Sequence, residues 1–256
     1  MSTRILIVGN WKMNLTIHEA SLYVHKLASK VKGHRNVEVV LAPSLLSLPT
    51  LSLQVERRQF KLAAQNFYWQ DEGAFTGEIS AHQLRGLVEY AIIGHSERRH
   101  IFGEHDKDIR AKVQAAVRHS LTPILCVGET AHERTAGETN GVLHDQVVGG
   151  LANLTAEEVA GIVIAYEPVW AIGTGNNATP ADVENAVKLI RRQVEHLYGG
   201  DIAASVRILY GGSVSADNAS SYLTTPGVDG LLPGGSSLKA DEFSAIVEAA
   251  HKAGKK

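Results

Sequence analysis

The sequence has few of the residues that mark secreted, disulfide-stabilised proteins. Cys126 is the single cysteine among 256 residues, so no disulfide can form within the chain. A disulfide framework of the kind found in small extracellular domains is therefore excluded. The composition is typical of a protein kept in a reducing compartment such as the cytoplasm. Cys126 lies in an apolar segment, which predicts a core residue and not a redox-active thiol.

Neither sign of charge is in large excess. Lysine and arginine number 25 against 27 for aspartate and glutamate, which leaves a formal net charge of −2. Such a balance lacks the basic surface that binds nucleic acid or an anionic membrane, so neither is expected as a partner. It also means that an anionic substrate must be attracted by local positive groups.

Long hydrophobic runs are missing as well. The first run, Ile5–Val8, has four residues and is too short for the hydrophobic segment of a signal peptide. No later run approaches the ~20 apolar residues that a membrane-spanning helix needs. The sequence therefore predicts neither a signal peptide nor a membrane span.

Apolar residues are nevertheless abundant, at 44% of the chain, and suffice for one large core. Eight short apolar segments alternate with segments of helical periodicity, at intervals of about 30 residues and without linkers. This alternation indicates a parallel sheet covered by helices. Polar or glycine-rich clusters follow six of the strands, which favours a closed (β/α)8 barrel over an open doubly wound sheet. We expect one such domain over residues 1–256.

The boundaries of the elements follow from local signals. The first helix is expected to close at Gly33, and Gly149-Gly150 is expected to break the helical stretch 130–160. Thr179-Pro180-Ala181-Asp182 forms a good helix start. The expected strands are Arg4–Val8, Val37–Ala42, Phe60–Ala64, Tyr90–Ile93, Pro123–Val127, Gly161–Ala165, Val206–Tyr210 and Val228–Leu232.

The stretch Ala165–Gly175, with the sequence AYEPVWAIGTG, carries the strongest chemical signal. Glu167 stands at the end of an apolar strand, and Pro168 stops that strand because it cannot donate to a sheet ladder. The short, glycine-punctuated segment Val169–Gly175 follows and predicts a mobile cover. A carboxylate under such a cover suits an enzyme that abstracts protons. The alternative is an ordinary loop with a solvated glutamate.

Eight ordered motifs, each at the end of an expected strand, resemble those of the triosephosphate isomerase family over essentially the whole chain. The resemblance implies a TIM barrel that interconverts dihydroxyacetone phosphate and D-glyceraldehyde 3-phosphate through an enediolate, in glycolysis and gluconeogenesis, with no metal and no cofactor. The motifs are GNWKMN (Gly9–Asn14), AQN (Ala64–Asn66), GAFTGE (Gly73–Glu78), IIGHSERR (Ile92–Arg99), CVGE (Cys126–Glu129), AYEPVWAIGTG, YGGSV (Tyr210–Val214) and DGLLPGGSSL (Asp229–Leu238).

The resemblance also assigns catalytic residues. Glu167 matches the family's base, and His95 matches the neutral imidazole that polarises the carbonyl oxygen. The segment after His95 reads as a helix start, whose amide groups disfavour an imidazolium. Lys12 matches the cation beside the enediolate and the phosphate, and we expect a buried ammonium that supplies the positive field absent from the net charge.

Further residues are implied around these three. The resemblance assigns Ser96, Glu97 and Thr76 to supporting positions, where Glu97 would either pair with Lys12 or lie among the polar groups around the catalytic residues. The glycines among the binding residues matter because an amide without a side chain beside it can approach an anion closely. The implied substrate-binding residues are Asn10, Lys12, Gly173, Ser213, Gly234 and Gly235.

A homodimer is implied through the loop Gly73–Glu78. In the family this loop enters a pocket of a second subunit, and the threonine matched here by Thr76 supports the neighbour's Asn10 and His95. An exposed aromatic such as Phe75 also needs a partner surface.

Two positions depart from the family pattern. Pro233 stands where a branched aliphatic residue is usual, and it predicts weakened strand pairing because proline lacks an N–H. Asn176-Asn177 replaces the usual lysine and small residue at the far end of the cover, and it puts the closing of that cover in doubt.

Two other classes of protein compete with the isomerase. A Schiff-base aldolase would need a lysine in strand six, and Gly161–Ala171 contains none. A non-catalytic sugar-phosphate-binding protein would bind the phosphate without exchanging solvent hydrogen into the substrate. The retention of all three catalytic types in context favours the isomerase.

Overall fold

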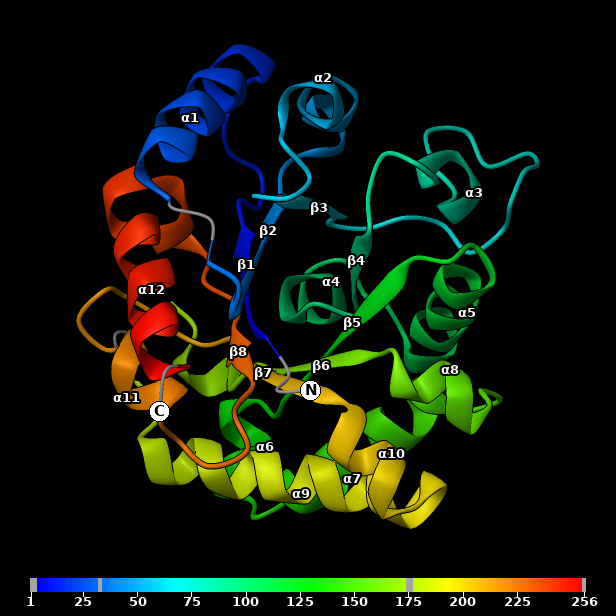
Figure 1. The fold of residues 1–256 in the computed structure, drawn as a ribbon. Helices are drawn as coiled ribbons and strands as arrows, with labels where there is room; N and C mark the ends of the chain where they lie inside the picture. Colours follow the sequence, from blue (N-terminus) through cyan, green and yellow to red (C-terminus); the bar gives the residue numbers. More distant parts are fainter. Residues whose placement is uncertain (1–3, 32–33, 174–176, 255–256) are drawn as a thin grey trace.

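The computed structural model describes residues 4–31, 34–173 and 177–254. Its strands close into a parallel barrel in which each strand pairs with its neighbour in the chain and β8 pairs with β1 (Figure 1). The expected closed barrel is therefore confirmed. The strands are β1 (Ile5–Asn10), β2 (Val37–Ala42), β3 (Lys61–Ala64), β4 (Tyr90–Ile93), β5 (Thr122–Val127), β6 (Val163–Tyr166), β7 (Arg207–Tyr210) and β8 (Gly230–Leu231).

Helices surround the barrel, and α12 packs beside α1 where the ring closes (Figure 1). No helix in the described ranges is long and apolar enough to cross a membrane. The α-helices are α1 (Ile17–Lys30), α2 (Leu48–Gln54), α3 (Ala81–Leu84), α4 (Ser96–His100), α5 (Asp106–Arg118), α6 (Ala131–Thr135), α7 (Thr139–Leu151), α8 (Ala156–Ala160), α9 (Pro180–Tyr198), α10 (Gly200–Ser205), α11 (Ala219–Leu223) and α12 (Ala240–Ala253), and the 3-10 helices are η1 (Leu45–Ser47), η2 (Val169–Ala171) and η3 (Gly235–Leu238).

Two sequence-based boundaries need comment. Helix α1 ends at Lys30, and Gly33 lies outside the described residues. Gly149-Gly150 does not break a helix but lies inside α7. A Cβ at Gly150 would stand 2.6 Å from the Leu125 side chain, so the glycine is required for close packing of α7 on β5.

Pro233 follows the two-residue strand β8, and the weakened pairing expected at Pro233 stays a prediction. Its carbonyl accepts a hydrogen bond from the Asn10 amide at 3.0 Å, and the Leu232 amide donates to the Tyr210 carbonyl at 2.8 Å. These two bonds join the chain around Pro233 to both neighbouring strands, although proline has no N–H to donate. The barrel stays joined at the point where β1 and β8 deliver their loops to its carboxyl end.

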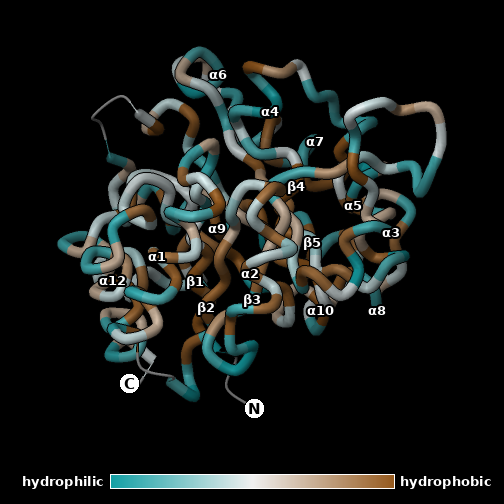
Figure 2. Tube along the Cα trace, turned by 90° about the horizontal axis from the view of Figure 1, so that it is seen from above, coloured by the Kyte–Doolittle hydropathy of each residue, from teal (hydrophilic) through white to brown (hydrophobic). Residues whose placement is uncertain are grey.

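The core has two layers that follow from the alternation of side chains along each strand. One set of strand residues fills the barrel interior and includes Leu6, Val8 and Cys126. The alternate set, such as Ile7, packs outward against the helices. Figure 2 shows the strands as largely hydrophobic and the polar stretches mainly on outer helices and loops. Cys126 is fully buried, as predicted, and burial raises the pKa of its thiol.

The amino end of the barrel holds a charged cluster around Glu38. Its carboxylate lies 2.6 Å from Lys61 Nζ, accepts from Tyr90 Oη at 2.6 Å and lies 3.3 Å from Arg207 Nη1. Burial alone would raise the pKa of Glu38, but these neighbours outweigh it and lower the pKa below the ordinary 4.5. Because this end of a barrel lies away from the loops that bind substrate, the cluster serves stability.

We therefore expect Glu38→Gln to lower the free energy of unfolding by about 3 kcal/mol at pH 7, because the partly buried Lys61 and Arg207 lose the buried carboxylate that pairs with them. A depressed pKa contributes stability that is complete above the unfolded value and lost as the pH falls through the folded value. The gap between Glu38→Gln and wild type should thus narrow below pH 4.5. Urea unfolding from pH 7 to pH 3 measures the difference in unfolding free energy between wild type and variant, with Glu56→Gln at an exposed position as control. A gap independent of pH would contradict this assignment.

Candidate active site

A cavity of about 340 Å³ opens at the carboxyl end of the barrel. It collects side chains and backbone from the ends of β1, β4, β6, β7 and β8, as expected for a barrel enzyme. Of the residues that the sequence singled out, the cavity is lined by Asn10, Lys12, His95, Gly173, Ser213, Gly234 and Gly235.

Glu167 follows β6 and lies behind His95, with 2% of its surface exposed. Its position depends on glycines at the ends of both neighbouring strands. A Cβ on Gly128 would stand 1.7 Å from the Glu167 carbonyl oxygen, and one on Gly211 would stand 3.0 Å from Glu167 Cγ. The glycine after β5 therefore leaves room for the Glu167 backbone, and the glycine after β7 leaves room for its side chain.

The Glu167 carboxylate has two polar neighbours. Oε2 accepts a hydrogen bond from the Ser96 amide at 2.8 Å, and Oε1 lies 2.9 Å from His95 Nε2. Burial alone would raise the pKa of Glu167, but His95, the Ser96 amide and Lys12 together lower it. The carboxylate is therefore ionised at neutral pH, which is the form that can accept a proton.

His95 is the N-cap residue of α4, and the predicted helix start after it is confirmed. Its Nδ1 accepts from the Glu97 amide at 3.2 Å, which leaves Nε2 as the protonated nitrogen that faces Glu167. Burial lowers the pKa of His95, as the expected neutral imidazole requires. The ionised Glu167 acts in the opposite direction, and the net pKa is raised in this arrangement.

Lys12 adopts a left-handed backbone with φ of 52°. This conformation is unfavourable for a lysine and is held by local hydrogen bonds. The Lys12 amide donates to Asn10 Oδ1 at 3.0 Å, and Gln65 Nε2 donates to the Lys12 carbonyl at 2.9 Å. Sequence reasoning placed Gln65 in a motif but did not assign it this supporting contact.

The Lys12 ammonium pairs with Glu97 Oε1 at 2.6 Å, as predicted. The expectation of a buried ammonium is wrong, because 31% of the Lys12 side chain is exposed. The side chain reaches from the rim of the barrel into the cavity, and the Glu97 carboxylate, which is 37% exposed, holds it there. An exposed rim position still places a positive charge in the path of an entering anion.

The opposite side of the cavity is built from backbone. Gly173 has a positive φ of 71°, and a Cβ on Gly234 would stand 3.3 Å from Lys12 Cε. Ser213 Oγ donates to the Ala171 carbonyl at 3.3 Å, which ties η2 to the loop after β7. Of the expected cover, Ile172 and Gly173 line the cavity, whereas Asn176 and residues 174–175 lie outside the described residues.

A second cavity, of about 200 Å³, shares Asn10, Lys12 and His95 with the first. Its other walls include Met13 and Phe102, which are 95% and 67% exposed. The loop that carries Thr76 is exposed and extends away from the barrel between β3 and α3 (Figure 1). Thr76 is thus not brought to the cavities of its own chain.

Comparison with known proteins identifies the family. The family profile described as "Triosephosphate isomerase" matches residues 5–250. This chain belongs to the triosephosphate isomerase family. The triosephosphate isomerase of Clostridium acetobutylicum is 48% identical over 243 residues, which cover 94% of this chain and 98% of that protein. The triosephosphate isomerase of Roseiflexus sp. is 48% identical over 94% of this chain and 96% of its own length. That of Streptococcus mutans is 43% identical over 97% of this chain and 99% of its own length. As a member of the triosephosphate isomerase family, the chain is an isomerase.

Proposed function

We propose that this isomerase interconverts dihydroxyacetone phosphate and D-glyceraldehyde 3-phosphate, as a step of glycolysis and gluconeogenesis, and that Glu167, His95 and Lys12 carry out the reaction. The observation that carries the proposal is that Lys12 and His95, from the ends of β1 and β4, line one cavity, and that Glu167, after β6, lies 2.9 Å from His95 Nε2. Family membership supports the reaction, and the geometry supports the residues.

The proton transfers use the ionised Glu167 and the Nε2–H of His95. Glu167 takes a proton from the carbon next to the carbonyl, and the electron pair of that C–H bond forms the enediolate. His95 donates from Nε2 to the carbonyl oxygen as charge develops there. Glu167 then returns its proton to the adjacent carbon. The hydroxyl on the first carbon gives its proton back to His95 Nε2 as it becomes the new carbonyl, so both side chains regain their starting states.

Lys12 and the backbone side of the cavity supply the attraction that the net charge of −2 does not. We assign the phosphate to the amides of Gly173, Ser213, Gly234 and Gly235, with Lys12 beside it. Asn10 positions the substrate oxygen, and its own Oδ1 accepts from the Lys12 amide. Short polar groups and unobstructed amides are the features that bind phosphate in barrels of this type.

An isomerase assay with each triose phosphate in turn tests the reaction. We expect turnover in both directions, with solvent deuterium entering the product. Binding of glycerol 3-phosphate without turnover or deuterium exchange would instead indicate a sugar-phosphate-binding protein. A covalent adduct trapped by borohydride would indicate an aldolase.

Lys12→Ala should raise KM and lower kcat, with a combined loss of ~10²-fold or more in kcat/KM, because the ammonium meets both the bound phosphate and the developing enediolate. Steady-state kinetics measures both constants, and the exposed Lys107→Ala is the control for loss of one positive charge. If KM does not move, Lys12 does not contact the phosphate.

The second cavity supports a homodimer. Met13 and Phe102 are largely exposed beside the catalytic residues, and the loop Gly73–Glu78 presents Phe75, 39% exposed, away from its own barrel. Apolar groups exposed in this way favour a partner surface. We propose that the loop of each subunit enters the second cavity of the other, where Thr76 contacts Asn10 and His95. The pair is then twofold symmetric.

Two further statements rest on composition and topology. We propose that the whole chain, residues 1–256, is one domain, because the barrel closes between β1 and β8 and α12 packs on α1. We propose a cytoplasmic location, because the lone Cys126 is buried and unpaired and the family's reaction belongs to central metabolism.

A further inference from the structure

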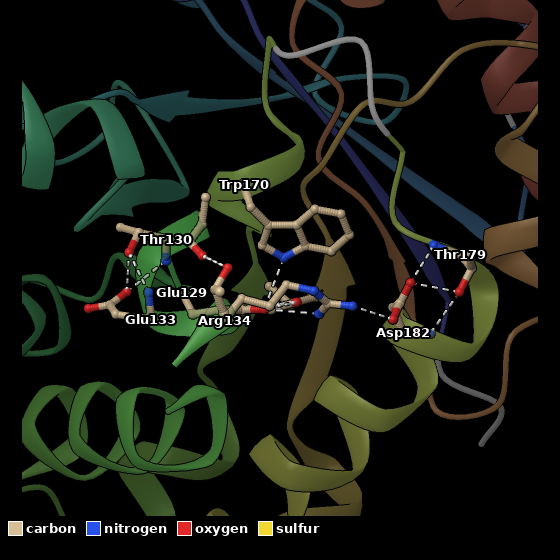
Figure 3. Close-up of polar contacts among 10 residues, drawn as sticks. Glu129, Thr130, Glu133, Arg134, Trp170, Thr179 and Asp182 are labelled. Atoms are coloured by element: carbon tan, nitrogen blue, oxygen red, sulfur yellow. Dashed lines mark hydrogen bonds and ion pairs between the residues drawn. The ribbon is translucent and has the colours of Figure 1, made fainter. Parts of the chain in front are cut away.

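Arg134, on α6, contacts Glu129, Trp170 and Asp182, which belong to three different segments of the chain (Figure 3). Its Nη2 lies 2.7 Å from Asp182 Oδ1, and its Nη1 lies 3.5 Å from Glu129 Oε1. The indole of Trp170 lies over its guanidinium, with Cζ 4.1 Å from the ring centroid. One planar cation thus joins the loop after β5, the 3-10 helix η2 and the first turn of α9.

Both ends of this connection are themselves held firmly. Glu129 is fully buried and accepts from Tyr166 Oη at 3.1 Å and from Trp170 Nε1 at 2.9 Å. Asp182 completes the capping box of α9, where it accepts from the Thr179 amide at 2.9 Å and its hydroxyl at 2.7 Å. Arg134 therefore links a buried anion to the helix cap that follows the cavity segment.

The segment that Arg134 restrains leads directly into the substrate cavity. Trp170 belongs to η2, and Ile172 and Gly173, two and three residues later, line the cavity. The backbone of η2 connects Trp170 to these peptides: the Ile172 amide donates to the Val169 carbonyl at 3.2 Å, so a shift of η2 at Trp170 would also shift Ile172. The position of the Gly173 amide thus depends on how Trp170 is held.

We propose that Arg134 is a positioning residue for substrate binding: it clamps Trp170 against Glu129 and the start of α9, and so holds the backbone of Ile172 and Gly173 at the phosphate side of the cavity. The proposal rests on the proposed function in one respect, since it takes the ligand of that side to be a phosphate monoester. A planar guanidinium suits the role because it can stack on an indole while its edge meets two carboxylates.

The role is distinct from general stabilisation. The Arg134 side chain is 37% exposed and its contact with Glu129 is long, at 3.5 Å, whereas the buried Glu129 keeps the hydrogen bonds from Tyr166 and Trp170 when Arg134 is removed. Substrate binding is more sensitive than fold stability to such a loss, because a small displacement of a group that contacts the substrate removes much of its contribution to binding. Loss of Arg134 should therefore change substrate binding far more than it changes the unfolding temperature.

The test compares Arg134→Gln with Arg110→Gln, which removes the same charge from an exposed position on α5. We measure KM and kcat for both triose phosphates, and Kd for glycerol 3-phosphate by calorimetry. Arg134→Gln should raise KM and Kd about tenfold, as expected for a displaced binding amide, and lower kcat much less. Arg134→Lys should show part of this loss, because an ammonium cannot stack on Trp170 and at the same time contact both Glu129 and Asp182. Arg110→Gln should match wild type.

A double-mutant cycle locates the effect. Asp182→Asn keeps an acceptor for the Thr179 amide but removes the charge that Arg134 meets. Its effect on Kd should largely vanish in the Arg134→Gln background, because the two side chains act as one unit. The cycle also serves if Arg134→Gln does not fold, since Asp182→Asn with Arg134→Lys then tests the same contact.

Unchanged KM and Kd in Arg134→Gln would overturn the proposal, and so would a loss confined to kcat. If the effects of Arg134→Lys and Asp182→Asn on the binding free energy, measured from Kd, are additive, the two side chains do not act as one unit and the proposal is contradicted. If wild type binds glycerol 3-phosphate but does not isomerise either triose phosphate, the proposed function fails. The Kd comparison then still decides the role of Arg134.

Discussion

Glu167→Gln should lower kcat by ~10³-fold or more, while Kd for glycerol 3-phosphate stays close to the wild-type value. The amide has nearly the shape of the carboxylate and can still accept from the Ser96 amide, so the fold around it should persist. What it cannot do is take a proton from carbon at neutral pH. Steady-state kinetics and calorimetry on the same preparation measure the two quantities.

The surroundings of Glu167 sharpen this prediction. The carboxylate is what raises the pKa of His95 in the resting arrangement, so Glu167→Gln should lower the pKa of that imidazole. Titration of His95 by NMR in wild type and variant measures the shift. His95→Gln should cost less activity than Glu167→Gln, because an amide can still donate to the carbonyl oxygen. The exposed Glu157→Gln is the control, and near-normal turnover by Glu167→Gln would place the base elsewhere.

Phe75→Glu combined with Thr76→Arg should yield monomers whose kcat falls by ~10²-fold or more, although every proposed catalytic residue is retained. The physical reason is that Lys12 and His95 border a second cavity whose outer wall is open in one chain. A partner's loop in that cavity would hold their rotamers, and supporting contacts of this kind typically govern active-site precision. Sedimentation and assay of the same sample measure assembly and turnover together.

The control for this pair is Leu197→Glu on α9. Leu197 is 41% exposed, close to the 39% of Phe75, and lies outside both cavities. Leu197→Glu therefore repeats the Phe75→Glu substitution at a similar apolar position. It should leave the assembly and kcat unchanged. Monomers of the loop variant with full activity would show that each subunit has a self-sufficient site. A loop variant that remains dimeric would place the interface on another surface.

Local patterns were sufficient for the fold. Val37–Ala42 and Tyr90–Ile93 match β2 and β4 residue for residue, because a buried parallel strand is largely apolar and its ends coincide with the change in composition. The start of α9 at Thr179 was equally predictable, since a capping box lies within four consecutive residues. The short helices α10 and α11 have no comparable signal and were not predicted.

The resemblance to the family named the residues that line the cavity, and local patterns placed each of them after a strand of a barrel whose strands all end on one side. Neither gave the state of those residues. The left-handed backbone of Lys12 depends on Gln65, and its exposure depends on Glu97, which is 85 residues away in the chain. The raised pKa of His95 likewise depends on Glu167, across the barrel.

Long-range packing set the remaining features. Gly150 reads as a helix breaker in sequence but is a packing contact in α7, because Leu125 of the neighbouring strand fills the space of a side chain. Arg134 carries no motif and Asp182 was predicted only as part of a helix start, yet they meet across 48 residues of sequence and join α6 to the first turn of α9. Such pairs are invisible to periodicity and composition, because contacts between distant residues exist only once the barrel has closed and brought the ends of its strands together.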